Sequence, residues 1–309
     1  MKTGTTLNIS AGNVFIDLRL DYAFKLTFGK HGNEDLLLKL VNAILPHLGI
    51  TSVSLMNQEE VGTHLKARKA VLDVHCTTSS NEEILIEMQF AYETDFGERM
   101  VFYSTFPIQN GVVRGNKGAG AYMFPDIYVV GITDFIMDGT KALPEPINHY
   151  SIRNEKYSDI GLAGNIHYVT VELPKLKSPG DPDASPEELI LYGIRDIGSM
   201  KEIPAIYREA GLEKLFEICR FAVLKKEEQM EYLHELMKKL DAQSELYSAE
   251  YRGEERGMAK GLEEGRVEGR AEGRAEEKIN TARNLKQLGV PLETIAQATG
   301  LSVEEIAAL

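Results

Sequence analysis

Two strand-like runs separated by a short polar turn are the feature that most constrains how this chain can fold. The runs are AVLDVHC (70–76) and EILIEMQF (83–90), and the polar turn between them is TTSSNE (77–82). Polar and apolar residues alternate in both runs, which is typical of strands whose two faces meet different surroundings. Because the turn is short, the pattern predicts that the two strands pair as an antiparallel hairpin.

The polar side of this hairpin carries two acidic residues. Asp73 and His75 share one face of the first strand, and Glu87 and Gln89 share one face of the second. A register centred on Ser80 places Asp73 opposite Glu87, where paired Cβ atoms lie about 4.5–5.5 Å apart. A register shifted by one residue would turn one carboxylate to the other face.

Two carboxylates this close repel each other unless a cation lies between them. Mg²⁺ takes oxygen ligands, commonly one or two carboxylates completed by water and substrate phosphate. A cation held by Asp73 and Glu87 could polarise a phosphodiester and lower the pKa of an attacking water. Gln89 could orient that water, although an amide is neither a base nor a cation. The alternative interpretation is an ordinary strand with its polar side in water, and His75 is interpreted as a structural histidine.

The segments around the hairpin predict an α/β domain. Helical spacing of apolar residues and strand-like runs alternate along the chain. The expected helices are 16–29, 34–45 and 97–110, and the further expected strands are 126–135 and 166–174. We therefore predict an α/β domain over residues 1–180.

Residues after 180 predict helices only. A helical region over 181–252 is expected to begin at Ser185 as N-cap, followed by Pro186. The tail, 253–309, has glycine at every fourth position from 253 to 273 and columns of like charge at the same spacing, which weaken an isolated helix. Its last part predicts a helical hairpin that turns at Gly300.

Charge and composition narrow the class of protein. The net charge of −13 excludes a broadly basic surface for non-specific nucleic-acid binding. No apolar run approaches the roughly 20 residues that span a bilayer. The two cysteines, Cys76 and Cys219, form neither a disulfide framework nor a metal-ligand pair, and no secretory signal is recognisable. We expect a cytoplasmic protein with no membrane partner.

Four segments in this order carry a family resemblance. They are DYAFKLTFG (21–29), the hairpin over 70–90, RMVFYSTF (99–106) and VELPKL (171–176). Together they resemble the Rpn family of recombination-promoting nucleases and transposases, within the PD-(D/E)XK nuclease superfamily. The resemblance covers about 1–180 and extends loosely through the helical region. It implies a restriction-endonuclease-like core, with a mixed central sheet flanked by helices, followed by an all-helical C-terminal region.

The resemblance also implies metal-dependent DNA cleavage with Mg²⁺, or with Mn²⁺ as an alternative. Asp73 and Glu87 would hold the metal, and Gln89 would complete the site where most of the superfamily has lysine. Asp21 matches a position from which an acid reaches the metal through water.

Two basic residues of the same segments, Lys25 and Arg99, match positions that could contact DNA phosphates. For these two residues and for Asp21, a solvated or ion-paired helix residue is the alternative.

We interpret the chain as a cytoplasmic, Mg²⁺-dependent DNA endonuclease that acts in recombination or transposition. The alternative is a catalytically degenerate nuclease fold that acts as a DNA- or protein-binding module. The glycine column and the charge columns of the tail predict a homo-oligomer formed through residues 253–309.

Overall fold

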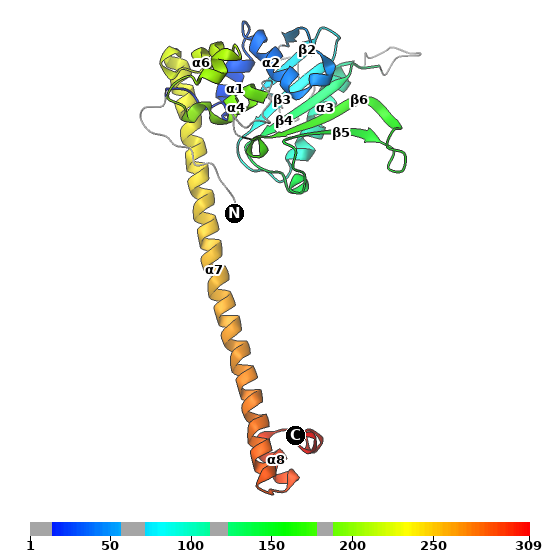
Figure 1. The fold of residues 1–309 in the computed structure, drawn as a ribbon, viewed down its shortest axis with the longest axis vertical. Coiled ribbons are helices and arrows are strands. Elements are labelled where there is room, and N and C mark those ends of the chain that lie inside the picture. Colours follow the sequence, from blue (N-terminus) through cyan, green and yellow to red (C-terminus); the bar gives the residue numbers. More distant parts are fainter. Residues whose placement is uncertain (1–13, 57–71, 112–122, 178–187) are drawn as a thin grey trace. The chain divides into compact units, whose positions relative to one another are not determined.

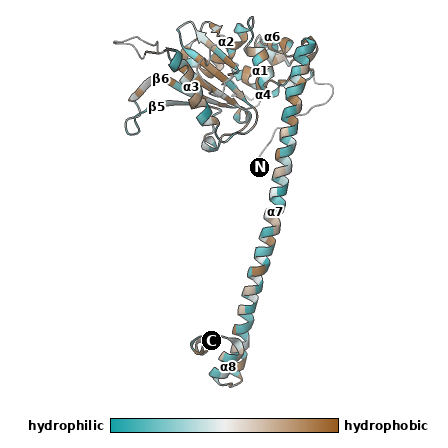
Figure 2. Cartoon of the chain, turned by 180° about the vertical axis from the view of Figure 1, so that it is seen from behind, coloured by the Kyte–Doolittle hydropathy of each residue, from teal (hydrophilic) through white to brown (hydrophobic). Residues whose placement is uncertain are grey.

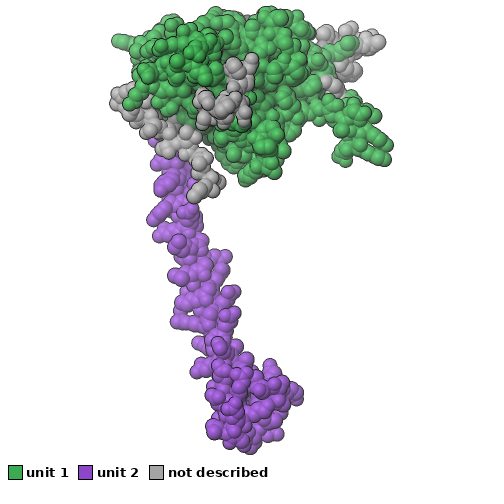
Figure 3. Space-filling model, in the orientation of Figure 1, with its two compact units in different colours: residues 1–238 green, residues 239–309 purple. Residues whose placement is uncertain are grey.

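The computed structural model of the protein describes residues 14–56, 72–111, 123–177 and 188–309 (Figure 1). The chain forms two compact units, residues 1–238 and 239–309 (Figure 3). The division between the units falls inside one long helix, α7 (Lys226–Gln287). The domain boundaries near 180 and 252 stay a prediction.

A mixed sheet, with six strands among the described residues, forms the centre of the first unit. Its strands are β1 (Val53–Leu55), β2 (Val74–Thr78), β3 (Glu83–Gln89), β4 (Ile127–Thr133), β5 (Ile147–Arg153) and β6 (Gly161–Glu172). Their order is β1-β2-β3-β4-β6-β5, with β3, β4 and β6 parallel and the outer pairs antiparallel. The central strands β3 and β4 are buried almost throughout; β4 accordingly is a near-continuous apolar run, whereas β3 buries Glu87 and Gln89 among its apolar residues.

Helices flank this sheet. Those before β4 are α1 (Asp21–Phe28), α2 (Glu34–Ile44), the short η1 (Pro46–Leu48) and α3 (Phe96–Gly111). Those after the sheet are α4 (Leu189–Asp196), α5 (Ala205–Glu209), α6 (Glu213–Ile218) and the start of α7. Short 3₁₀ turns lie at Asp138–Thr140, Leu173–Lys175, Ile197–Ser199 and Phe221–Val223.

A glycine in β4 lets α3 pack directly on the sheet. A Cβ atom on Gly131 would lie 2.7 Å from the ring of Phe96 and 2.8 Å from the sulfur of Met100. Phe96 and Met100 are buried in a cluster that includes Leu85 and Val129. Helix α3 therefore covers the face of the sheet that Gly131 shares with its neighbour in β3.

The fold class predicted from the sequence is confirmed. The chain has a restriction-endonuclease-like α/β core, a mixed sheet flanked by helices, and a helical C-terminal region. The expected helices 34–45 and 97–110 and the strands 83–90 and 126–135 agree with α2, α3, β3 and β4 within a few residues.

Several predicted boundaries are wrong. Helix α1 begins at Asp21 and not at 16, because Leu18 and Leu20 are fully buried in an irregular segment before it. The predicted turn begins at Thr77, whereas in the structure Thr77 and Thr78 belong to β2, because β-branched residues favour strands. The turn is completed by Asn81 at φ 71°.

One strand was not predicted, and one prediction concerns residues that the structure does not describe. The strand β5 was not anticipated, since its exposed sequence INHYSIR lacks an apolar face. The predicted helix start at Ser185 and Pro186 lies outside the residues that the structure describes.

The second unit consists of the rest of α7 and a small helical hairpin. Figure 2 shows mostly hydrophilic residues along this part of α7, with isolated hydrophobic ones. The hairpin is α8 (Leu292–Thr299) and α9 (Val303–Ala308).

Buried Ala282, Ile295 and Ile306 form the core of this hairpin. Gly300, at φ 73°, ends α8 in the left-handed conformation. Ser302 and Glu305 form a capping box at the start of α9. The predicted hairpin with its turn at Gly300 is therefore confirmed. No helix among the described residues is both long and apolar enough to cross a membrane.

Candidate active site

The hairpin of β2 and β3 brings the two predicted acids together. Its register places Val74 opposite Ile86 and His75 opposite Leu85, which is the predicted register centred on Ser80. Extended by one residue, this register puts Asp73, just before β2, opposite Glu87.

Helix α1 ends beside Asp73. A Cβ atom on Gly29 would lie 2.9 Å from the carbonyl oxygen of Lys25 and 3.2 Å from that of Asp73, so only glycine fits without displacing backbone. Asp21 is the first residue of the same helix. The family segment DYAFKLTFG thus positions α1 against the start of β2.

Asp73 is buried and held by the backbone of β3. The residue is 5% exposed. Its Oδ2 accepts a hydrogen bond from the N–H of Met88 at 2.8 Å. Burial raises the pKa of Asp73 well above its usual value, and the charges of Glu87 and Asp21 raise it further, against the lowering effects of the Met88 hydrogen bond and of Lys25.

Glu87 is also buried, at 8% exposure. Its Oε1 accepts a hydrogen bond from the hydroxyl of Tyr103 at 3.2 Å and lies 3.4 Å from Nη2 of Arg99. Its Oε2 has no hydrogen-bond partner among the described residues. Burial raises the pKa of Glu87 to about 7, against the opposing charge of Arg99 and together with the repulsion of Asp21.

Gln89 lies one step further along the same face of β3. Its Nε2 donates to the carbonyl oxygen of Ala91 at 2.9 Å, and its Oε1 accepts a hydrogen bond from Nη2 of Arg99. Arg99 also forms an ion pair with Glu93 at 2.9 Å. The guanidinium of Arg99 therefore joins the acid and the amide of the candidate motif.

The predicted residues lie around the acid pair. Arg99 contacts Glu87 and Gln89 directly, whereas Asp21 and Lys25 act on the acids through their charges. The charge of Asp21 acts on both Asp73 and Glu87, and the charge of Lys25 acts on Asp73. Arg99 faces Glu87 and Gln89 from α3, so a DNA phosphate would have to share it with these groups.

Tyr103 was missed by the sequence reasoning. It lies one helical turn after Arg99 on α3, and the i, i+4 spacing places both side chains on the helix face that meets Glu87. The segment RMVFYSTF contained that signal. His75, in contrast, contacts Glu83 at 3.1 Å across the hairpin, which fits its structural interpretation.

The acid pair fits a divalent cation of the magnesium type. Within the described ranges, no group of three or more His, Cys, Asp or Glu residues is arranged to hold an ion, so the protein would supply two carboxylates and leave the other positions to water and phosphate. Oε2 of Glu87 is buried without a partner, and the pKa values of both acids are raised. A cation between the two carboxylates would give Oε2 of Glu87 a partner and would stabilise the charged form of both acids.

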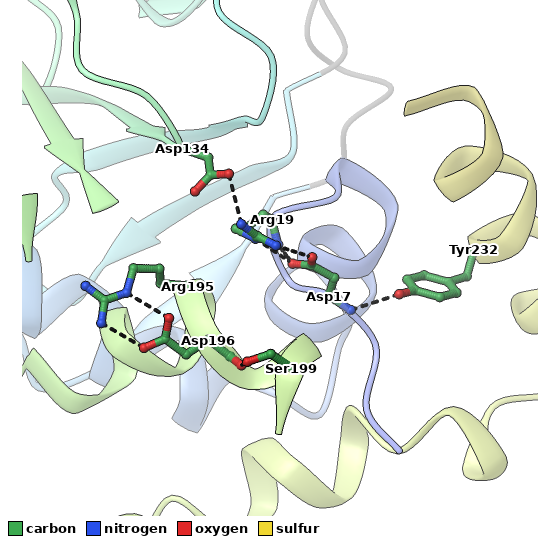
Figure 4. A network of polar contacts seen from close by, with 7 residues as sticks. All are labelled: Asp17, Arg19, Asp134, Arg195, Asp196, Ser199 and Tyr232. Carbon is green, nitrogen blue, oxygen red and sulfur yellow. Dashed lines mark hydrogen bonds and ion pairs between the residues drawn. The ribbon is translucent and has the colours of Figure 1, made fainter. Parts of the chain in front are cut away.

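A buried ionic network borders this site (Figure 4). Arg19 contacts Asp17 at 2.7 Å and Asp134 at 3.0 Å. The N–H of Asp134 donates to the carbonyl oxygen of Gln89 at 3.1 Å, and the N–H of Asp17 donates to the hydroxyl of Tyr232 at 3.0 Å. The network therefore connects the end of β3 to the first turns of α7.

A mixed sheet flanked by helices, with an acid pair and a glutamine at its centre, defines a nuclease-type protein of the PD-(D/E)XK class. The chain belongs to the PD-(D/E)XK nuclease family transposases, whose family model matches residues 18–249. The match includes α1, the whole sheet and the first part of α7. Neither the curated proteins nor the solved structures contain a match to the chain.

Proposed function

We propose that the protein is a metal-dependent DNA endonuclease that hydrolyses phosphodiester bonds at the Asp73–Glu87 pair. The observation that carries the proposal is the buried Oε2 of Glu87, which no described residue hydrogen-bonds, in a hairpin register that puts Glu87 opposite Asp73. Membership of a nuclease family supports the same reaction class. Mg²⁺ suits two carboxylates best, and Mn²⁺ could replace it.

Asp73 and Glu87 would hold the cation, and the remaining groups would position the reactants. The bound cation would polarise the phosphodiester and lower the pKa of the attacking water. Asp73 is fixed by Met88 and Glu87 by Tyr103, so both carboxylates keep their orientation without the metal. Asp21 would contact the cation through water.

Arg99 would supply the positive charge that a lysine supplies in most of the superfamily. Gln89 occupies the lysine position but is neutral, and Arg99 contacts both Gln89 and Glu87. A guanidinium there could stabilise the charge that develops on the phosphate. Lys25, whose charge reaches Asp73, is the second basic residue that we assign to the DNA backbone.

DNA is therefore the proposed substrate, and recombination or transposition in the cytoplasm is the proposed context. The alternative is a degenerate nuclease fold that binds DNA or protein without turnover. The net charge of −13 and the neutral Gln89 favour that alternative. Nicking of supercoiled plasmid with Mg²⁺, with and without EDTA, separates the two, because only the enzyme converts the plasmid.

We also propose that a second copy of the chain binds along α7. Every residue from 245 to 281 is exposed. Tyr247, Tyr251, Met258 and Leu262 are 61–78% exposed and recur at spacings of 4, 7 and 4, which places them along one side of the helix. These spacings are close to a coiled-coil seam.

Glycine and charge extend this seam toward the end of α7. The six glycines from 253 to 273 have no heavy atom within 4 Å of a built Cβ, and the last three (265, 269 and 273) continue the side of the helix that carries Tyr251 and Met258, so a partner helix could approach closely there. The arginines 266, 270 and 274 and the glutamates 268, 272 and 276 lie on nearly opposite sides of the helix, so each column could face the opposite charge of a second copy.

A further inference from the structure

A cavity of about 300 Å³ lies on the opposite face of the sheet from the acid pair. In the parallel register, Glu87 is next to Gly131, so their side-chain positions share the face that α3 covers. Tyr128 is an odd number of residues before Gly131 in β4, and it lines the cavity from the other face. The cavity is therefore separate from the candidate active site.

The cavity gathers imidazole groups from three elements. His149 comes from β5, His167 from β6 and His47 from η1. The rings of His47 and His149 are 5.6 Å apart, and His167 stacks on Tyr128 with ring centroids 4.5 Å apart and planes 9° apart. A flat aromatic pair thus stands next to two further imidazoles.

A guanidinium and a hydroxyl complete the lining. Arg153, at the end of β5, donates from Nε to the hydroxyl of Ser151 at 2.7 Å and from Nη1 to the carbonyl oxygen of Ser158 at 3.0 Å. These bonds fix the orientation of the guanidinium beside the cavity. None of the described residues that line the cavity is a carboxylate.

We propose that this cavity binds a phosphate group carried by a nucleotide or by a nucleic-acid strand. A fixed guanidinium, several imidazoles and a hydroxyl are the donors that phosphate oxygens accept from. The volume is at the lower end of the range for small-molecule sites, so it admits a phosphate with an attached flat ring. The site does not depend on the proposed nuclease function.

Proton binding should accompany phosphate binding. Burial lowers the pKa of His149, and the neighbouring charges of His47 and His167 lower it further, because the three imidazoles repel when protonated. A bound phosphate would reduce this repulsion. Arg153 and the phenols of Tyr128 and Tyr150 also face the cavity, and the charges of Asp126 and Glu82 act on Tyr128. Binding of a DNA duplex, whose phosphodiesters keep the same charge over this range, should therefore weaken from pH 6 to pH 8.

The test is calorimetric titration of the full chain, without divalent metal, with three probes. The probes are 5′-AMP, inorganic phosphate and a short DNA duplex, and adenosine without phosphate is the control ligand. Arg153→Gln removes the guanidinium, and Arg208→Gln on α5 removes one exposed arginine elsewhere as the matched control. Asp73→Asn would be titrated as well, so that binding of duplex at the acid pair is recognised.

We expect a phosphate probe to bind, adenosine to fail, and Arg153→Gln to weaken binding at least tenfold while Arg208→Gln leaves it unchanged. His149→Gln should reduce the difference in duplex binding between pH 6 and pH 8. Preference for 5′-AMP identifies a nucleotide, and preference for duplex identifies nucleic acid; both support the proposal. Binding of none of the phosphate probes at millimolar concentration would overturn it. Phosphate binding that Arg153→Gln leaves unaffected would overturn it as well.

Discussion

The backbone N–H of Met88 donates a hydrogen bond to Oδ2 of Asp73 at 2.8 Å, which ties the first acid of the pair to the strand that carries the second. The main chain of β3 therefore sets the distance between the two carboxylates. This arrangement holds the acids together although burial raises the pKa values of both, the charge of Glu87 raises that of Asp73 further, and the charge of Asp21 raises both. The adjacent carboxylates are the two groups that we propose to share a cation.

Asp73→Asn should separate metal binding from stability. The asparagine oxygen can still accept from Met88, and the variant lacks the repelling charge, so the metal-free variant should melt at a higher temperature than the wild type. Millimolar Mg²⁺ or Mn²⁺ should raise the midpoint of the wild type, because a ligand that binds only the folded state stabilises it by mass action, about 2.7 kcal/mol at 100 times Kd. In the variant this increase should shrink. The measurement is a thermal melt with and without metal.

Asp159→Asn, which removes an exposed acid, is the control for this experiment. It should keep the full response of the wild type to metal. An equal metal response in Asp73→Asn would place the cation elsewhere.

Arg99 and Gln89 should behave as a coupled pair in DNA cleavage. Gln89→Lys should retain some activity, yet its ammonium would face the Arg99 guanidinium instead of accepting its hydrogen bond. Arg99→Gln alone should lose at least tenfold in kcat, because no other cation contacts both Glu87 and Gln89 within the described residues. The double variant should be more active than the two single losses predict together, and a double-mutant cycle of cleavage rates measures this coupling. Simple additivity would argue against a shared role.

The buried network beside the site should make stability depend on pH. Burial raises the pKa of Asp134 to about 6, and Arg19, which lowers it, is shared with Asp17. A carboxyl whose folded pKa is raised contributes stability below its unfolded pKa and loses that contribution as the pH rises through about 6. The wild type should therefore lose on the order of 3 kcal/mol relative to Asp134→Asn between pH 4 and pH 7.

Urea unfolding of both proteins across this range measures the difference. Asp159→Asn should run parallel to the wild type. If Asp134→Asn also runs parallel, the charge of Asp134 is not penalised in the folded state.

Substitutions on one side of α7 should dissociate the proposed oligomer. Tyr251→Glu and Met258→Glu, seven residues apart, place a charge in the exposed seam, whereas Leu246→Glu changes an equally exposed residue about 140° away from Tyr251. Sedimentation of the full chain at low salt should show a dimer for the wild type and for Leu246→Glu, and a monomer for the seam variants. High salt should weaken the wild-type dimer, because its charge pairs are exposed. A wild type that is monomeric at low salt would contradict the proposal that a second copy binds along α7.

The sequence predicted the central hairpin because alternation, a short polar turn and two opposed acids are local signals. It failed where burial and not periodicity decides, as at Leu18 and Leu20, which are buried without being helical. The exposed strand β5 has no apolar face and is held by its pairing with β6, which no local pattern reveals.

The same limit applies to the sites. Arg99 was predicted as a DNA contact, but its links to Glu87 and Gln89 arise from the packing of α3 on the sheet. The cavity with His47, His149 and His167 could not be predicted either, because its three histidines are distant in sequence and only the β4–β6–β5 pairing and η1 bring them together.

Cleavage of supercoiled plasmid DNA tests the central claim most directly. Wild type, Asp73→Ala, Glu87→Ala and the control Asp159→Asn should be compared with Mg²⁺ or Mn²⁺, with and without EDTA, after far-UV circular dichroism has shown that each is folded. We predict that the wild type and Asp159→Asn nick the plasmid only with metal, and that neither alanine variant does. Full cleavage by Asp73→Ala would contradict the assignment of the active site to the Asp73–Glu87 pair. Absence of cleavage by the wild type with every divalent metal would contradict the proposed endonuclease activity.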